Sequence, residues 1–193
     1  RELTRRFGDE GLYKGGLSVR TTLDPGMQGI AEQALRDGLI KYDRRHGYRG
    51  PVARIKVTGQ WRKVLSNMEK PAGAGGWSLA IVLRVDQKTA FVGMKTGKIG
   101  SIPLSELKWA REWLEPQKMG PQVMEASDAL KVGDVVLVEQ LARNDMSEHS
   151  GSKRYGLRQV PAVNGAIIVI NPHTGRVYAM SGGYDYETSE FNR

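Results

Sequence analysis

Residues 77–94 read WSLAIVLRVDQKTAFVGM, and this stretch decides the fold of the middle of the chain. Two runs rich in β-branched and apolar residues, Trp77–Val85 and Thr89–Met94, flank the polar triplet Asp86-Gln87-Lys88. This arrangement predicts two antiparallel strands joined by a tight turn. The longest apolar run in it, Leu79 to Leu83, is far shorter than the roughly 20 residues that a membrane-spanning helix needs. We therefore expect a soluble β-rich unit.

Three more strand-like segments follow this hairpin: Lys98–Ile102, Val135–Leu141 and Tyr155–Gln159. The segment Ser105–Trp113 between the third and fourth strands is predicted as a short helix. Five short strands with one helix after the third are typical of the OB barrel.

The segments on either side of this unit have a different pattern. Gly16–Leu23 alternates and is β-branched, which predicts a strand. Asp24-Pro25 then starts a helix over residues 24–45, because Asp caps a helix and Pro suits its first turn. Ala166–Ile170 is a continuous apolar run, which predicts a strand buried on both faces, and Arg176–Met180 returns as the second strand of a hairpin.

The predicted fold is mainly β with α: a five-stranded OB-type barrel inserted in a small strand–helix–β-hairpin unit. The helix carries an apolar stripe that includes Ile30, Ala34 and Leu35. We expect this stripe to bury against Ile168 and Ile170 of the hairpin.

The net charge of +8 is concentrated at the N-terminal end. Residues 1–70 contain 15 Lys and Arg against 8 Asp and Glu, and residues 71–193 contain 14 against 13. Such a surface suits an anionic neighbour such as phospholipid, nucleic acid or an anionic polymer, and it equally suits a solvated face.

Three short motifs imitate a catalytic signature of enzymes that use a serine nucleophile. Ser105–Lys108 and Ser150–Lys153 both fit Ser-x-x-Lys, and Lys95–Gly97 reads Lys-Thr-Gly. The chemistry needs the serine at a helix start, and Lys-Thr-Gly on a strand that follows it in sequence. Here Lys-Thr-Gly precedes both serines, so we interpret all three as chance matches and assign no catalytic residue.

No cofactor or metal site is predicted either. His46, His149 and His173 are far apart in sequence, there is no cysteine, and the glycine-rich segment 73–76 lacks the Lys-Ser/Thr ending of a phosphate loop.

Aromatic and basic residues alternate in the middle of the chain, as they do on the nucleic-acid-binding faces of OB folds. A plainer interpretation is that Trp77 and Phe91 fill the barrel, and that Trp109 and Trp113 pack a helix on it. The candidate interaction surface comprises Lys95, Lys98, Lys108 and Arg111.

Several stretches resemble the class A penicillin-binding proteins. GGLSVRTTLDPGMQGIAEQAL, residues 15–35, is similar to the start of their transpeptidase region, and QVPAVNGAIIVINPHTGRVYAMSGG, residues 159–183, to its first central hairpin. Phe191–Arg193 resembles the segment ahead of the catalytic Ser-x-x-Lys. WSLAIVLRVD, GKIGSIPLSELKWAR and LKVGDVVLVEQ resemble the OB-like domain that part of the family carries.

The resemblance implies a domain organisation. Residues 1–15 are expected to be a linker, 16–47 the strand and helix at the N-terminal edge of the transpeptidase domain, 48–160 the inserted OB-like domain, and 161–193 the hairpin of the transpeptidase domain. The chain opens with Arg-Glu-Leu-Thr rather than Met, which indicates a piece of a longer protein.

The resemblance also implies a function. The parent would be a peptidoglycan synthase with glycosyltransferase and D-Ala-D-Ala transpeptidase domains, anchored on the periplasmic side of the bacterial inner membrane. This fragment would hold no catalytic site, so the sequence leaves its enzyme status open. Its OB-like domain would be a regulatory or interaction module that contacts other domains of the synthase and a regulatory protein, while peptidoglycan and penicillin would bind the missing domains.

The alternative interpretation is an S1-type barrel that binds single-stranded nucleic acid, because AFVGMKTGKIGSIPLSEL followed by LKVGDVVLV resembles that family too. S1 barrels do not interrupt a strand–helix–hairpin unit, and most of the positive charge lies outside the barrel, so we expect no nucleic-acid partner.

Overall fold

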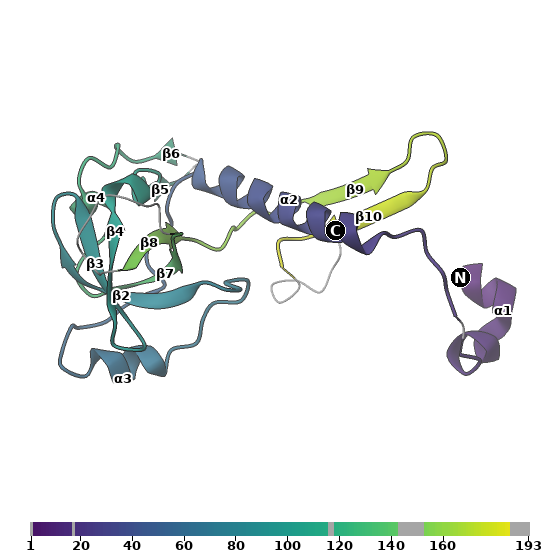
Figure 1. Ribbon diagram of the computed structural model, residues 1–193, viewed down its shortest axis with the longest axis horizontal. Coiled ribbons are helices and arrows are strands. Elements are labelled where there is room, and N and C mark those ends of the chain that lie inside the picture. The colour runs from purple at the N-terminus through teal and green to yellow at the C-terminus, as the bar shows by residue number, and fades with distance from the viewer. Residues whose placement is uncertain (1, 17, 116–117, 143–152, 186–193) are drawn as a thin grey trace.

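The computed structural model describes residues 2–16, 18–115, 118–142 and 153–185. A β-barrel lies at one end of an elongated molecule, helix α2 leads from it to a β-hairpin, and helix α1 lies at the other end (Figure 1). The predicted loop 144–153, apart from its last residue, and the segment 191–193 lie outside the described residues. The elements in chain order are α1 (Glu2–Tyr13), α2 (Pro25–Arg44), β1 (Ala53–Arg54), α3 (Trp61–Ser66), β2 (Ser78–Val85), β3 (Thr89–Met94), β4 (Ile99–Pro103), the 3-10 helix η1 (Leu104–Glu106), β5 (Trp113–Leu114), β6 (Lys118–Met119), α4 (Ala126–Ala129), β7 (Asp134–Gln140), β8 (Lys153–Arg158), β9 (Ala166–Ile170) and β10 (Val177–Gly182).

Strands β2, β3, β4, β8 and β7 form a closed five-stranded barrel. Each strand pairs with the next in that order, and β7 pairs with both β8 and β2, which closes the ring. The β4–β8 pairing is parallel, with Gly100 opposite Lys153, and the other barrel pairings are antiparallel. The predicted mainly β fold with a five-stranded OB-type barrel is therefore confirmed.

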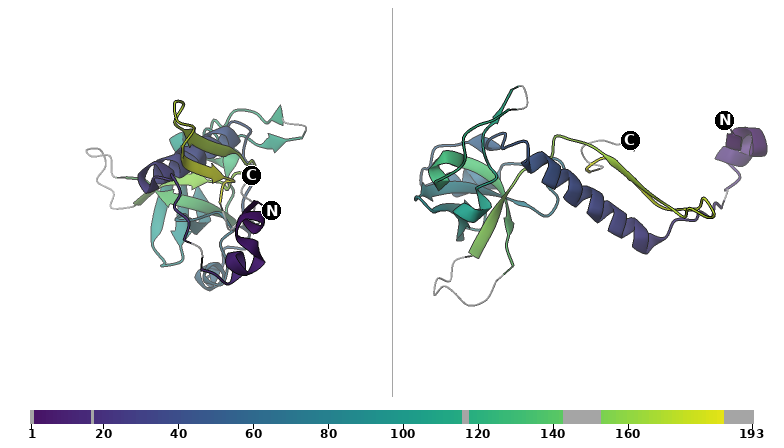
Figure 2. Two further views of the ribbon diagram at one scale, coloured as in Figure 1. Left: turned by 90° about the vertical axis from the view of Figure 1, so that its right-hand side faces the viewer. Right: turned by 90° about the horizontal axis from the view of Figure 1, so that it is seen from above.

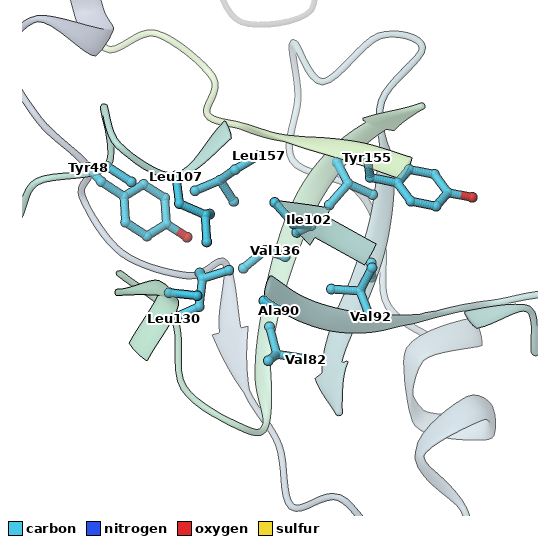
Figure 3. Close-up of a cluster of buried hydrophobic side chains, with 14 of the residues drawn as sticks. Tyr48, Val82, Ala90, Val92, Ile102, Leu107, Leu130, Val136, Tyr155 and Leu157 are labelled. Atoms are coloured by element: carbon cyan, nitrogen blue, oxygen red, sulfur yellow. The ribbon is translucent and has the colours of Figure 1, made fainter. Parts of the chain in front are cut away.

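Strand β2 is buried on both faces. Ala80 and Val82 point into the barrel, whereas Leu79 and Ile81 belong to a second apolar cluster outside it. Since successive side chains of a strand point to opposite faces, double burial requires apolar residues at every position, as in Leu79 to Leu83. Figure 3 shows the cluster inside the barrel, where side chains from several strands meet those that follow β4. Its fully buried members include Val92, Ile102, Leu107, Val136 and Leu157.

The second cluster joins the barrel to the helices. Leu39 of α2 and Leu65 of α3 pack there against Trp77 and Leu137. Leu65 is fully buried, and Leu39 is 8% exposed. The C-terminal half of α2 is thus part of the barrel's outer packing.

Helix α2 begins where the sequence predicts. Asp24 is the N-cap, and its Oδ1 accepts a hydrogen bond from the Met27 backbone N–H at 2.9 Å. Pro25 takes the first helical position, where a missing N–H costs nothing. At about 1.5 Å per residue the helix is about 30 Å long, and it runs beside the hairpin in both Figure 1 and Figure 2.

The predicted strand over residues 16–23 is wrong. The described residues of this segment form no strand. Thr22 Oγ1 in this segment and the N–H of Asp24 just after it donate to β10, at the carbonyls of Val177 and Tyr178. Further along the same edge, the Gln28 side-chain amide both donates to and accepts from the Met180 backbone. The Gln28 side chain thus occupies the N–H and carbonyl of Met180, which a strand added at this edge of β10 would need for pairing.

The predicted burial of the hairpin is also wrong. Ile168 and Ile170 are 53% and 52% exposed, and Ile30 of α2 is 72% exposed. Helix α2 and the hairpin contact each other through other residues: Ala31 of α2 and Ala179 of β10 are almost fully buried. Ala34 is exposed and Leu35 partly buried. Because strand side chains alternate, packing α2 on one face leaves the other apolar face of the hairpin open.

The predicted helix over 105–113 is wrong as well. Only η1 is helical, and Trp113 lies in β5, paired with Met119 of β6. Leu107 turns into the barrel and is fully buried. Arg111 donates through Nε and Nη2 to the Gly120 carbonyl at 2.8 and 2.6 Å, which holds β6 against the chain.

Residues 1–15, expected to be a linker, contain α1, which is kinked at Gly8 (φ 68°) and has no buried residue. None of the helices in the described part of the chain is both long and apolar enough to cross a membrane.

Candidate functional site at the junction of barrel and helix

The motifs that imitate a serine enzyme lie at unrelated places on the barrel surface. Lys95–Gly97 is the turn between β3 and β4. Ser105 lies in η1, and Lys108 is exposed beyond it. In the second serine motif Lys153 begins β8 and donates to Gln140, while Ser150 is outside the described residues.

The histidines are separated too. His46 Nδ1 lies 2.8 Å from the Tyr42 carbonyl, and its ring is 4.4 Å from that of Tyr42. His173 lies in the β9–β10 turn, and His149 is outside the described residues.

The four residues predicted as an interaction surface divide into two pairs. Lys95 and Lys98 lie in the β3–β4 turn, whereas Lys108 and Arg111 follow the other end of β4. Lys95 Nζ donates to the Met68 carbonyl at 2.9 Å, and Arg111 holds Gly120 as described. Lys98 and Lys108 point into solvent. The structure therefore brings only Lys95 and Lys98 together.

The aromatic residues of that region are structural. Trp77 is 7% exposed in the second cluster, and Phe91 lies beneath the Arg84 guanidinium, 4.1 Å from the ring centre. Trp109 packs edge-on against Tyr48, with ring centres 5.8 Å apart. No helix carries Trp109 and Trp113, in contrast to the expectation.

The most connected polar group in the described chain is Asp43, near the end of α2. It is 2% exposed. Its Oδ1 accepts from Arg49 Nη1 at 2.8 Å and from the Ala162 N–H at 3.0 Å. Its Oδ2 accepts from Arg49 Nη2 at 3.0 Å and from Gln159 Nε2 at 2.8 Å. A buried carboxylate is stable only when paired and hydrogen-bonded in this way.

These contacts join the two places where the chain crosses between the barrel and the unit formed by α2 and the β9–β10 hairpin. Arg49 lies on the way into the barrel, and Gln159 and Ala162 lie on the way out. Gln159 Oε1 also accepts from the Arg49 N–H at 2.8 Å, and Arg49 Nη2 donates to the Val160 carbonyl at 2.7 Å. We call Asp43, Arg49 and Gln159 the junction clasp.

Arg44, the last residue of α2, lies against strand β8 of the barrel beside the clasp. Its Nη2 donates to the Leu157 carbonyl at 3.2 Å, and its guanidinium lies 4.8 Å from the Trp109 ring centre. Burial, and after it the charge of nearby Arg158, lowers the pKa of Arg44. The Arg44 Nε is buried and has no hydrogen-bond partner among the residues that the structure describes. The Arg44 side chain is therefore held by packing against Trp109 and by one carbonyl.

Arg36 forms a second link between α2 and its surroundings. Its Nη1 lies 3.2 Å from Asp185 Oδ2, and its Nη2 donates to the Gly73 carbonyl at 3.2 Å. The guanidinium is also 4.5 Å from the Tyr184 ring centre. A groove of about 620 Å³ runs along this side, between α2 and the barrel. Its charged lining residues are Arg36, Asp37, Lys41, Arg44, Glu139 and Arg158.

Sequence reasoning missed the clasp, although one signal was present. An acidic side chain in the last turn of a helix opposes the helix dipole, which favours cations there. Asp43 violates that preference, and the cost is offset only by the donors that the fold brings to it. Its partners lie 6, 116 and 119 residues away in sequence, so no local pattern could name them.

Tyr48 gives the junction a pH dependence. Burial, and after it the charge of Asp134, raises the pKa of Tyr48 above its ordinary value of 10.0. The unfolded chain therefore loses the phenolic proton first, so the free energy of unfolding should fall as pH rises above 10, by at most about 1.4 kcal/mol per pH unit for this group. Tyr48→Phe should make that fall shallower in urea denaturation between pH 9 and 11. An unchanged slope would contradict the assignment.

The comparisons with known proteins agree on one family. Residues 48–163 match the family model described as penicillin-binding protein OB-like domain. Penicillin-binding protein 1A of Rickettsia typhi is 42% identical over 95% of this chain, and that of Pseudomonas aeruginosa is 35% identical over all of it. The chain spans only 21% and 22% of the lengths of these two relatives.

A solved structure shows the same arrangement. The crystal structure of penicillin-binding protein 1A from Haemophilus influenzae aligns with a TM-score of 0.62 and 27% identity, over 99% of this chain and 26% of that one. The likeness therefore extends beyond the barrel to the helix and hairpin. The chain belongs to the penicillin-binding protein 1A family, and its residues 48–163 match the OB-like domain of that family.

Proposed function

We propose that this chain is a non-catalytic part of a peptidoglycan synthase, and that its OB-like domain is an interaction module through which a regulatory protein acts. The parent would combine glycosyltransferase and D-Ala-D-Ala transpeptidase domains. Residues 16–47 and 161–193 would belong to the transpeptidase domain, and residues 48–160 would be the insertion.

The observation that carries this proposal is the junction clasp. The chain enters the barrel near Arg49 and leaves it near Ala162, and Asp43 accepts a hydrogen bond from each of these residues. From the clasp, α2 runs as one uninterrupted helix to Gln28, whose amide holds the Met180 backbone of β10. A force on the barrel would thus reach the hairpin through a rigid rod. A module that only filled space would need no such connection.

The proposal also covers location and partners. The parent would be anchored in the inner membrane with this part on the periplasmic side. Its partners would be the other domains of the synthase and a regulatory protein. Peptidoglycan and penicillin would bind the transpeptidase and glycosyltransferase domains. Against a nucleic-acid role stands the burial of Trp77 and the packing of Trp109, since base stacking needs exposed rings.

The test uses the parent protein, extended to its natural C-terminus and mixed with fluorescent penicillin. We expect a covalent label, because the family's catalytic serine forms an acyl-enzyme with the β-lactam. The label should disappear when the first Ser-x-x-Lys serine downstream of Arg193 becomes Ala. Ser105→Ala, in the motif that imitates it, should leave labelling unchanged. A folded parent that takes no label would refute the synthase proposal.

A further inference from the structure

Five cationic side chains cover the face of the barrel where α3 meets the β3–β4 turn. Arg62 and Lys63 lie in α3, Lys70 follows it, and Lys95 and Lys98 lie in the turn. All five are exposed. None of them belongs to an ion pair formed among the residues that the structure describes. We call this set the α3 face.

The α3 face is one rigid surface although its cations come from distant parts of the chain. Lys95 Nζ donates to the Met68 carbonyl just after α3, at 2.9 Å. A Cβ on Gly97 would lie 3.1 Å from Arg62 Cζ, so the Arg62 guanidinium rests directly on the turn. The fully buried Leu65 anchors α3 to the barrel. Lys95 and Arg62 are therefore held in place before any partner binds, which reduces the entropy cost of binding.

A pocket of about 690 Å³ opens in this face. Ser66, Asn67, Glu69, Lys70 and Lys95 are among its lining residues. Lys70 Nζ donates to the carbonyls of Gly75 and Trp77 at 2.6 and 3.3 Å. An ammonium group has three donors, so Lys70 keeps one and Lys95 keeps two for an incoming acceptor. The hydroxyl and amide beside them can complete the bonds to a carboxylate.

We infer that the α3 face binds an acidic segment of a protein partner. This inference rests on the proposed function, because it gives the chemistry of the regulator that the interaction module would receive. Lys70 and Lys95 line the pocket with a single carboxylate, that of Glu69. The other three cations of the α3 face lie around it. A peptide with several Asp or Glu residues complements that charge and fits a concave polar pocket.

The same face is poorly suited to the other anionic partners. Single-stranded nucleic acid stacks its bases on exposed aromatic rings, but a Cβ on Gly93 would lie 2.5 Å from Trp61 Cη2, so that ring lies on the barrel. A lipid surface is bound by Trp, Phe or Leu side chains that insert beside the cations. The exposed large apolar residues next to these cations in sequence are Val64 and Ile99, and no exposed Trp, Phe or Leu adjoins them among the described residues.

The test titrates this chain with a fluorescein-labelled synthetic peptide of alternating glutamate and serine. We expect saturable binding by fluorescence anisotropy, weakened by salt, with backbone amide shifts at residues 61–70 and 94–99. Lys63→Glu with Lys98→Glu should weaken binding about tenfold, since charge reversal turns attraction into repulsion. Neither side chain makes a hydrogen bond among the described residues, so the fold should persist.

The matched control is Lys118→Glu with Lys131→Glu, which changes the net charge equally at exposed lysines elsewhere. It should weaken binding less than about twofold. No peptide binding, or equal weakening by both pairs, would overturn the inference. So would displacement of the peptide from this face by oligothymidylate or by phosphatidylglycerol vesicles at lower concentration. A parent that takes penicillin while this chain ignores the peptide would refute the inference and leave the synthase proposal standing.

Discussion

Replacing Asp43 with alanine should lower the free energy of unfolding by about 3 to 5 kcal/mol. The carboxylate is 2% exposed and accepts four hydrogen bonds. Removing it leaves the charge of Arg49 and the Ala162 N–H without their partner, and breaking a buried pair from one side costs this much. Urea denaturation followed by tryptophan fluorescence measures the loss. Hydrogen exchange at the Ala162 amide should quicken at the same time, because that N–H bonds directly to Asp43.

The control is Asp37→Ala on the same helix. Asp37 is exposed, and within the described part of the chain its side chain accepts a hydrogen bond only from Gln33, at 2.9 Å. Its replacement should change the unfolding free energy by less than about 0.5 kcal/mol. If the two variants proved equally stable, Asp43 would not hold the junction. If the barrel is the interaction module that we propose, its regulator should also lose its effect on the parent's cross-linking when Asp43 is replaced, while penicillin labelling persists.

Replacing Leu107 with alanine should cost about 3 kcal/mol, the second-largest effect. Leu107 is 0% exposed and lies inside the barrel with Ile102 and Leu157 (Figure 3). Truncating a buried leucine loses its transfer free energy and leaves a cavity that the closed barrel cannot collapse to fill.

Leu114→Ala is the matched control for this prediction. Leu114 lies in β5 and is 40% exposed, so its truncation should cost less than about 1 kcal/mol. Equal losses in the two variants would mean that Leu107 does not fill the core. Thermal unfolding by circular dichroism gives an independent reading of both.

Two apolar runs of five residues show how far sequence patterns go. Leu79–Leu83 and Ala166–Ile170 look alike, and both predict a strand. Both are strands, but only the first is buried on both faces, because α3 and the end of α2 cover the outside of β2. On the hairpin, α2 covers one face and leaves Ile168 and Ile170 half exposed. Composition indicates what a strand is able to bury, and the neighbouring elements determine whether it is buried.

The segment 105–113 shows a second limit. Its apolar residues fit helical spacing, yet the chain leaves the helix after Glu106. Leu107 packs inside the barrel. The Tyr48 backbone holds the residues that follow: its N–H donates to the Arg111 carbonyl, and its carbonyl accepts from the Trp113 N–H. These tertiary contacts outweigh a weak local helix propensity. Tyr48 is about 60 residues away in sequence, so the pattern of the segment could not reveal them.

The sequence by itself determined the barrel strands in their order, the start of α2 at Asp24, and the membership of the family. Each of these depends on near neighbours: alternation within a strand, an N-cap three residues from its partner, or motifs in a fixed order. Only the tertiary structure decided the junction clasp, the α3 face and the open side of the hairpin. Each of those depends on groups from distant parts of the chain, and the free energy of a buried charge or an apolar face depends on what the fold places opposite it.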